Sequence, residues 1–101
     1  MTEPKPVRLA EDALHRALAS LPEWHLEGES KDAVITRTFK FADFVDAMKF
    51  VDRLAEAAEN AGHHPDIDIR YNRVRLALVT HDAGGITQKD IDLAGVADGL
   101  I

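Results

Sequence analysis

The chain of 101 residues contains no cysteine. A disulfide framework, a thiol nucleophile and a cysteine-type zinc site are therefore excluded. No apolar run approaches the roughly 20 residues that a helix needs to cross a bilayer. The first residues also lack the apolar segment of a signal peptide. From these absences we expect a cytoplasmic protein with no membrane partner.

Positive charge is also scarce. Lys and Arg number 12 against 18 Asp and Glu, and the formal net charge is −6, with no basic stripe. Direct binding to nucleic acid needs cations clustered on one face, so we expect no direct nucleic-acid partner. Hydrophobic residues make up 46% of the chain, which is enough for an ordinary core. The length suits one domain, which we place at residues 9–101 behind a flexible lead at 1–8.

Hydrophobic spacing predicts the first elements of this domain. Apolar residues at helical spacing predict a helix over 9–21, which Pro22 stops. Residues 24–27 and 33–39 are typical of strands, with a polar turn at 28–32 between them. The strand at 33–39 has a mixed pattern, so its buried face is not predicted.

The clearest element is an amphipathic helix of about five turns that begins near Phe41. Apolar residues recur along it at intervals of three and four, and charged residues occupy its other side. Gly62 suits the left-handed position just past a last helical turn, and Pro65 pushes His64 into an extended conformation. We therefore expect this helix to end immediately before a pair of histidines.

Two more strands and a last helix complete the pattern. Residues 67–71 and 74–79 are predicted strands that turn at Asn72. Thr87 and Asp90 belong to a variant capping box that opens the last helix. The whole order, α-β-β-α-β-β-α, predicts a two-layer α+β domain with three helices on one face of a four-stranded antiparallel sheet. The other face and the sheet edges stay free, so we expect an oligomer.

Three of the five histidines, His63, His64 and His81, fall within 19 residues. Imidazole has an unperturbed pKa of about 6.5, so it gives and takes protons near neutrality. Each of the three is expected at the end of an element, where pockets are usually built. Their clustering indicates either proton chemistry or a metal site. We interpret His15 and His25 as surface residues.

Structural roles compete with the functional ones. His63 and His64 could form only a polar helix terminus, where the helix dipole favours a protonated ring. His81 could be a solvated strand end. Asp90 could be acidic for a structural reason alone, because it belongs to a capping box. A zinc site is less favoured than proton transfer. The neighbouring His63 and His64 point apart in an extended segment, and no His-x-x-x-His pair is present.

The residues from Glu59 to Asp90 have a long and specific spacing. The pattern is Glu59, three residues, His63-His64-Pro65, five residues, Tyr71, nine residues, His81, eight residues and Asp90. This pattern resembles that of the pterin-4a-carbinolamine dehydratases, and the resemblance extends from about Trp24 to Ala97. One departure is Gly62, which stands where the family more often has a polar residue.

The resemblance implies an activity. It is the loss of water from 4a-hydroxytetrahydropterin (4a-hydroxytetrahydrobiopterin) to give quinonoid dihydropterin, which recycles the cofactor of aromatic amino-acid hydroxylases. It also implies no metal, no bound cofactor, and a homodimer or homotetramer. The implied catalytic residues are His63, His64, His81 and Asp90. The implied substrate-binding residues are Gly62, His63, His64, Val79, Thr80, His81 and Asp82.

Dehydration of a carbinolamine needs one proton delivered to the departing hydroxyl at C4a and one proton lost from N5. By the resemblance, His63 and His81 are the acid and the base, in an order that stays open, and His64 grips the hydroxyl side. Asp90 would orient a histidine as well as cap its helix. Two alternatives remain: a non-catalytic dehydratase-like assembly or regulatory partner, and a metal-dependent hydrolase that uses the same histidines.

Overall fold

The computed structural model describes residues 6–29 and 32–101, and its elements follow the predicted order. They are α1 (Glu11–Ala19), β1 (His25–Glu27), β2 (Val34–Lys40), α2 (Phe44–Ala61), β3 (Asp66–Arg70), β4 (Arg73–Leu78), the 3₁₀ turn η2 (His81–Ala83) and α3 (Gln88–Asp98). The predicted lead at 1–8 and the predicted turn at 28–32 both extend outside the described residues.

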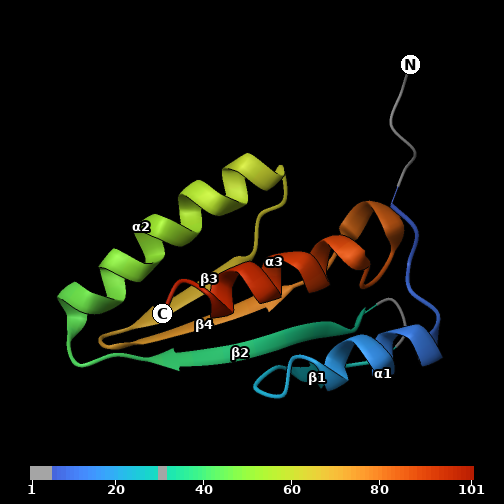
Figure 1. Cartoon of the computed structure of the whole chain (residues 1–101), viewed down its shortest axis with the longest axis horizontal. Helices are drawn as coiled ribbons and strands as arrows, with labels where there is room; N and C mark the ends of the chain where they lie inside the picture. The colour runs from blue at the N-terminus through green and yellow to red at the C-terminus, as the bar shows by residue number, and fades with distance from the viewer. Residues whose placement is uncertain (1–5, 30–31) are drawn as a thin grey trace.

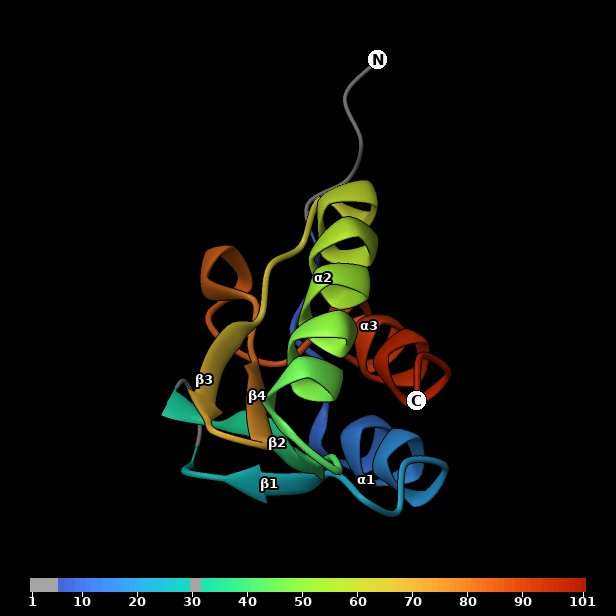
Figure 2. The same cartoon turned by 90° about the vertical axis from the view of Figure 1, so that its left-hand side faces the viewer.

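The four strands form one antiparallel sheet in the order β1-β2-β4-β3. Strands β2 and β4 are central, and β1 and β3 are the edges. Helices α1, α2 and α3 all lie on one side of this sheet, as the two perpendicular views in Figures 1 and 2 show. The predicted two-layer α+β domain is therefore confirmed. Among the described residues, no helix has both the length and the apolar character that crossing a membrane requires.

The core lies between the helical layer and the sheet. On β4 the row of Val74, Leu76 and Leu78 is almost fully buried. Helix α2 contributes residues three and four apart that lie on its sheet-facing side: Ala47, Phe50, Leu54 and Ala58. This spacing is that of one helical face, so the amphipathic pattern and the packing agree.

Strand β2 turns its odd-numbered residues toward the helices, which the sequence pattern had left open. Ile35 and Phe39 are buried in this row. Arg37 stands between them, and its Nη1 lies 2.6 Å from Oδ1 of Asp98 on α3. Its guanidinium also lies 4.2 Å from the centre of the Phe39 ring. The buried row of β2 therefore contains a charged residue, which a distant carboxylate neutralises. This is why the alternation of apolar and polar residues was not clear in the sequence.

Helix α2 begins at Phe44 and not near Phe41, so the predicted start was wrong by three residues. Asp43 adopts an extended conformation, and its Oδ1 accepts a hydrogen bond from the backbone N–H of Asp46 at 2.8 Å. An aspartate in this position satisfies a free N–H of the first helical turn, and it therefore defines the N-terminus of the helix.

The C-terminus of α2 is a Schellman motif. Gly62 has φ 64°, in the left-handed region. The N–H of Gly62 donates to the carbonyl of Glu59, and the N–H of His63 donates to the carbonyl of Ala58, both at 3.1 Å. These two bonds satisfy carbonyls that the helix end would otherwise leave free. They also direct the chain out of the helix at His63, as the Gly–His pattern predicted.

Gly62 supplies the first testable prediction. Nothing lies within 4 Å of a Cβ built at this position, so only the left-handed backbone opposes a side chain. We expect Gly62→Ala to lower the free energy of unfolding by about 1 kcal/mol. Gly62→Asn should lower it by less, since asparagine tolerates this conformation. Urea denaturation of both variants checks this, and equal losses would contradict it.

Candidate active site

His63 and Asp90 are in direct contact, although His63 follows the end of α2 and Asp90 lies 27 residues later in the first turn of α3. Nε2 of His63 lies 2.5 Å from Oδ1 of Asp90. The His63 side chain is 11% exposed, and the Asp90 side chain is fully buried. A carboxylate can only accept a hydrogen bond, so Nε2 carries the hydrogen. In the neutral ring, Nδ1 is then the nitrogen that is free to accept a proton.

The second carboxylate oxygen of Asp90 accepts two further hydrogen bonds. The hydroxyl of Thr80 donates to Oδ2 at 2.8 Å, and the backbone N–H of Thr87 donates to it at 2.9 Å. Because the single hydroxyl hydrogen of Thr80 is used in this way, the hydroxyl of Thr87 must donate to Thr80 across their 2.7 Å contact. Three donors therefore hold one buried carboxylate in a single orientation.

Asp90 also caps α3, as the sequence predicted. Thr87 and Asp90 form a complete capping box, with the Thr87 hydroxyl accepting from the N–H of Lys89 at 3.2 Å. The same carboxylate thus closes the helix start with one oxygen and contacts a histidine with the other. No buried side-chain nitrogen or oxygen lacks a partner in the part of the chain that the structure describes.

His81 lies near this site because the preceding residue, Thr80, bonds to Asp90. Strand β4 ends at Leu78, so the prediction that His81 ends a strand was wrong, and His81 instead begins η2. The cause is an isolated bridge between Thr80 and Gly85, whose backbone groups bond in both directions at 3.1 and 3.3 Å. This bridge closes a tight loop over 81–84. His81 is exposed at its start, one residue from the Asp90 network.

His64 is exposed and lies on the outer side of the segment. Its Nε2 is 2.9 Å from Oε2 of Glu59, and these side chains are 64% and 81% exposed. The glutamate before the histidine pair therefore contacts His64 and not His63. An ion pair this exposed contributes little to stability. Of the remaining predicted site residues, Gly62 and Asp82 are exposed and Val79 is partly buried.

A small cavity of about 150 Å³ lies between α2 and α3, and His63 lines it together with Lys89, Leu93 and Val96. Neither His64 nor His81 lines this cavity. In one protomer the candidate site therefore combines one enclosed imidazole with two exposed ones. Among residues 6–29 and 32–101, no three His, Asp or Glu side chains are arranged to hold a metal ion.

Sequence reasoning missed the hydrogen bond from the Thr80 hydroxyl to Asp90. A signal for it was present in the strand pattern, because Thr80 continues the inner apolar row of Val74, Leu76 and Leu78. A hydroxyl in a buried row must find a hydrogen-bond partner. The expected surface positions of His15 and His25 are confirmed, since both are exposed.

Thr80 provides a second prediction. Thr80→Val removes the donor to Asp90 and the acceptor for the Thr87 hydroxyl, so the free energy of unfolding should fall by about 1–2 kcal/mol. Thr38→Val, on the exposed side of the neighbouring strand β2, should stay within about 0.5 kcal/mol of the parent. Urea denaturation measures both. Equal values would show that the buried hydroxyl contributes nothing.

Comparison with known proteins places this arrangement in a family. A family model described as Pterin 4 alpha carbinolamine dehydratase matches residues 7–100. A relative from Acidobacterium capsulatum is 56% identical over 94 residues, covering 93% of this chain and 98% of its own. One from Chloroflexus aggregans is 53% identical over 94 residues, covering 93% and 97%. Both are named, provisionally, as pterin-4-alpha-carbinolamine dehydratases.

Two solved structures share the fold. A transcriptional coactivator/pterin dehydratase from Brucella melitensis matches with a TM-score of 0.86 at 38% identity, covering 92% of this chain and 97% of that one. A pterin dehydratase-like protein, identified as a RuBisCO assembly factor in the alpha-carboxysome, matches with a TM-score of 0.67 at 23% identity, a likeness of fold alone, covering 77% and 88%. The fold is thus that of the pterin dehydratases. The chain belongs to the pterin-4a-carbinolamine dehydratase family.

Proposed function

We propose that this protein removes water from 4a-hydroxytetrahydropterin to give quinonoid dihydropterin, and so recycles the pterin cofactor of aromatic amino-acid hydroxylases. Family membership supports the reaction class. The observation that carries the proposal is the contact between Nε2 of His63 and the buried carboxylate of Asp90. When a carboxylate holds the hydrogen of one ring nitrogen, the other nitrogen of the neutral histidine is fixed as the proton acceptor.

The chemistry requires two proton transfers and no nucleophile. The C4a–O bond breaks as a proton reaches the departing hydroxyl, and water leaves. The N5–H bond gives up its proton, and its electron pair forms the C4a–N5 double bond. In the proposal, His63 and His81 carry out these two transfers, each typically worth about 10²–10⁴-fold in rate. His81 is exposed, so it can exchange its proton with solvent between turnovers.

His64 has a different part in the proposal, because its ring is exposed and, among the described residues, Glu59 is its one side-chain partner. It contacts the hydroxyl side of the substrate and transfers no proton. Thr80 acts indirectly, through Asp90: its hydroxyl and its backbone groups are already used within the protein. The substrate is the pterin itself, and the proposed reaction needs neither a metal nor a bound cofactor.

A coupled assay tests the proposal. An aromatic amino-acid hydroxylase generates the 4a-carbinolamine, and the appearance of quinonoid dihydropterin is followed by absorbance with and without this protein. We expect formation of the product to be faster than the spontaneous dehydration, in proportion to the protein added. A rate equal to the spontaneous one at every protein concentration would contradict the proposal.

We also propose a homodimer or homotetramer. Large apolar side chains are exposed on α2 (Phe44 and Val45) and on the β3–β4 hairpin (Ile67 and Tyr71). Exposed apolar side chains of this size, beside the open edge strand β3, are typical of surfaces that associate. Sedimentation equilibrium at micromolar concentration should give a mass of two or four chains. A monomer under these conditions would contradict the association.

The second candidate function is a non-catalytic assembly or regulatory partner. It is favoured by the Brucella melitensis protein, which is described as a transcriptional coactivator/pterin dehydratase. Against it, this chain keeps the complete set of His63, His64, His81 and Asp90. A stoichiometric protein partner in a pull-down, together with no turnover in the coupled assay, would support the second candidate over the first.

A further inference from the structure

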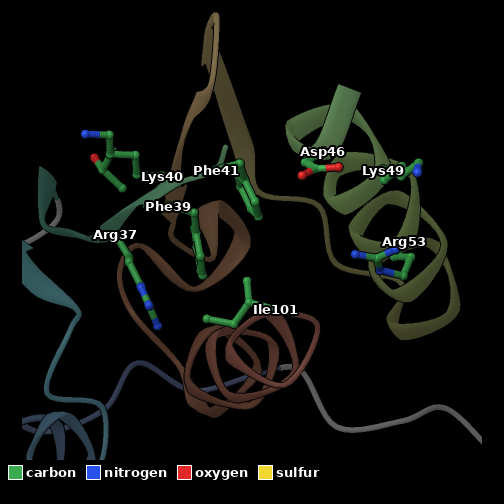
Figure 3. Close-up of a pocket in the computed structure, with 9 residues that line it drawn as sticks. Arg37, Phe39, Lys40, Phe41, Asp46, Lys49, Arg53 and Ile101 are labelled. Carbon is green, nitrogen blue, oxygen red and sulfur yellow. The ribbon is translucent and has the colours of Figure 1, made fainter. Parts of the chain in front are cut away.

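A second hollow, separate from the histidines, lies between β2 and the N-terminal half of α2. Its volume is about 360 Å³, which falls within the range of about 300–1,000 Å³ that small-molecule sites occupy. It shares no lining residue with the cavity beside His63. Figure 3 shows its side chains converging from β2, from α2 and from Ile101.

The floor of the hollow is aromatic and rigid. Phe39 is buried and Phe41 is partly buried, and they lie two residues apart. Their rings both pack against the buried Phe50, with centroid distances of 4.7 and 5.1 Å. In Figure 3 both rings lie on the hollow, opposite the exposed Ile101. The Arg37 guanidinium already covers the Phe39 ring, so an apolar or aromatic group could lie against the Phe41 ring with little rearrangement of the protein.

The walls carry positive charge that is not neutralised. Arg53 and Lys49 lie one turn apart on α2, whereas Lys40 is even-numbered on β2 and its side chain points away from the hollow in Figure 3. In the described part of the chain, neither Arg53 nor Lys49 forms an ion pair with a carboxylate. The one side-chain carboxylate that lines the hollow is Asp46. This local excess of cations is notable in a chain whose formal net charge is −6.

Arg53 is the cation best placed to hold a ligand. Figure 3 shows its guanidinium directed across the hollow toward Ile101. Its one hydrogen bond within the described protein is a long one, 3.4 Å from Nη2 to the carbonyl of Leu100. A guanidinium has five N–H donors, so most of them stay available. Arg37 differs, since Asp98 already neutralises it.

We propose that this hollow binds a small organic anion with an aromatic or branched apolar body. Its carboxylate is held by Arg53, with Lys49 one turn away on the same helix, and its body lies on Phe41. Neither part of the surface is sufficient alone. An inorganic anion would leave the aromatic floor uncovered, and a neutral aromatic compound would leave the cations unpaired. A guanidinium binds a carboxylate through two parallel hydrogen bonds, which favours a carboxylate over other single charges.

The test uses the full chain labelled with ¹⁵N and three probes: 2-naphthoate, the neutral 2-naphthylmethanol, and sodium sulfate. We expect 2-naphthoate to shift the amide signals of residues 39–41 and 49–53 in a saturable manner. Its dissociation constant should be about 1 mM or lower, as the size of the probe suggests. The alcohol and sulfate should each bind at least about ten-fold more weakly, since each lacks one half of the interaction.

A pair of matched variants locates the site. Arg53→Gln should weaken 2-naphthoate binding by about ten-fold, because it removes a charged hydrogen-bond donor. Arg16→Gln removes the same charge from the exposed side of α1 and should bind as the parent does. Unshifted signals at β2 and α2, equal binding of naphthoate and the alcohol, or unchanged affinity in Arg53→Gln would each overturn the proposal.

The hollow could instead be a contact between copies of the chain, and this too is tested. Sedimentation equilibrium of Arg53→Gln should give the same assembly as the parent. A changed assembly would show that the cations hold a second subunit, which overturns a ligand site. The proposal is independent of the dehydratase reaction, because binding is measured without any turnover.

Discussion

The variant His63→Ala is expected to lower kcat for carbinolamine dehydration by roughly ten- to a thousand-fold. In the proposed mechanism, His63 carries one of the two proton transfers, and Asp90 has fixed which ring nitrogen is free. Alanine cannot transfer a proton. The neighbouring His64 cannot take over the role of His63, because its ring contacts Glu59. The measurement is the coupled dehydratase assay under saturating substrate.

A second substitution at the same position separates proton transfer from structure. His63→Gln keeps an N–H donor for the carboxylate of Asp90 but cannot transfer a proton near neutrality. It should unfold within about 1 kcal/mol of the parent and still lose kcat to the same extent as His63→Ala. If His63→Gln kept full activity, the contact with Asp90 would be structural and the proposed role of His63 would be wrong.

Two other histidines show whether the loss is specific to the site: His81 belongs to it, and His25 is the control. His81→Ala should also lower kcat, with almost no change in stability, because the side chain is exposed. His25→Ala, exposed on β1 at the far edge of the sheet, should leave both kcat and stability unchanged. Loss of activity in all three variants alike would point to a general effect of removing imidazole and not to a site at His63 and His81.

Local chemistry accounts for the parts of the fold that the sequence could predict. The end of α2 was predictable because Gly62 and Pro65 act on their own backbone and on that of their neighbours. The start of α3 was predictable for the same reason, since Thr87 and Asp90 bond across three residues. The start of α2 was not, because Phe41 continues the apolar spacing although Asp43 caps the helix two residues later.

Contacts between distant residues account for the rest. Arg37 and Asp98 are 61 residues apart, and no local pattern pairs a strand cation with the last residue of a helix. His63 and Asp90 were predicted as site residues from the family resemblance. Their spacing in the sequence could not by itself have shown that they are in contact. Glu59 shows the same limit: it precedes both histidines, and only the direction of the chain after Gly62 decides that it contacts His64.

Asp90→Ala should cause the largest loss of stability, about 2–4 kcal/mol of unfolding free energy. The substitution removes the Asp90 half of the capping box of α3 and leaves three buried or partly buried donors without an acceptor. They are the ring N–H of His63, the hydroxyl of Thr80 and the backbone N–H of Thr87. Urea denaturation measures the loss. Asp92→Ala, an exposed acidic residue in the same helix, is the control and should change stability by less than about 0.5 kcal/mol.

Asp90→Asn separates the charge of this carboxylate from its shape. The amide oxygen can still accept the hydrogen bonds of Thr80 and Thr87, so its NH₂ group then faces Nε2 of His63. Two donors cannot share one contact, so the neutral ring must move its hydrogen to Nδ1. The nitrogen that was free to accept a proton is then blocked, and kcat should fall even though the fold survives. The ¹⁵N shifts of the His63 ring report the tautomer directly: we expect hydrogen on Nε2 in the parent and on Nδ1 in the variant, and an unchanged tautomer with reduced kcat would show that Asp90 acts in another way.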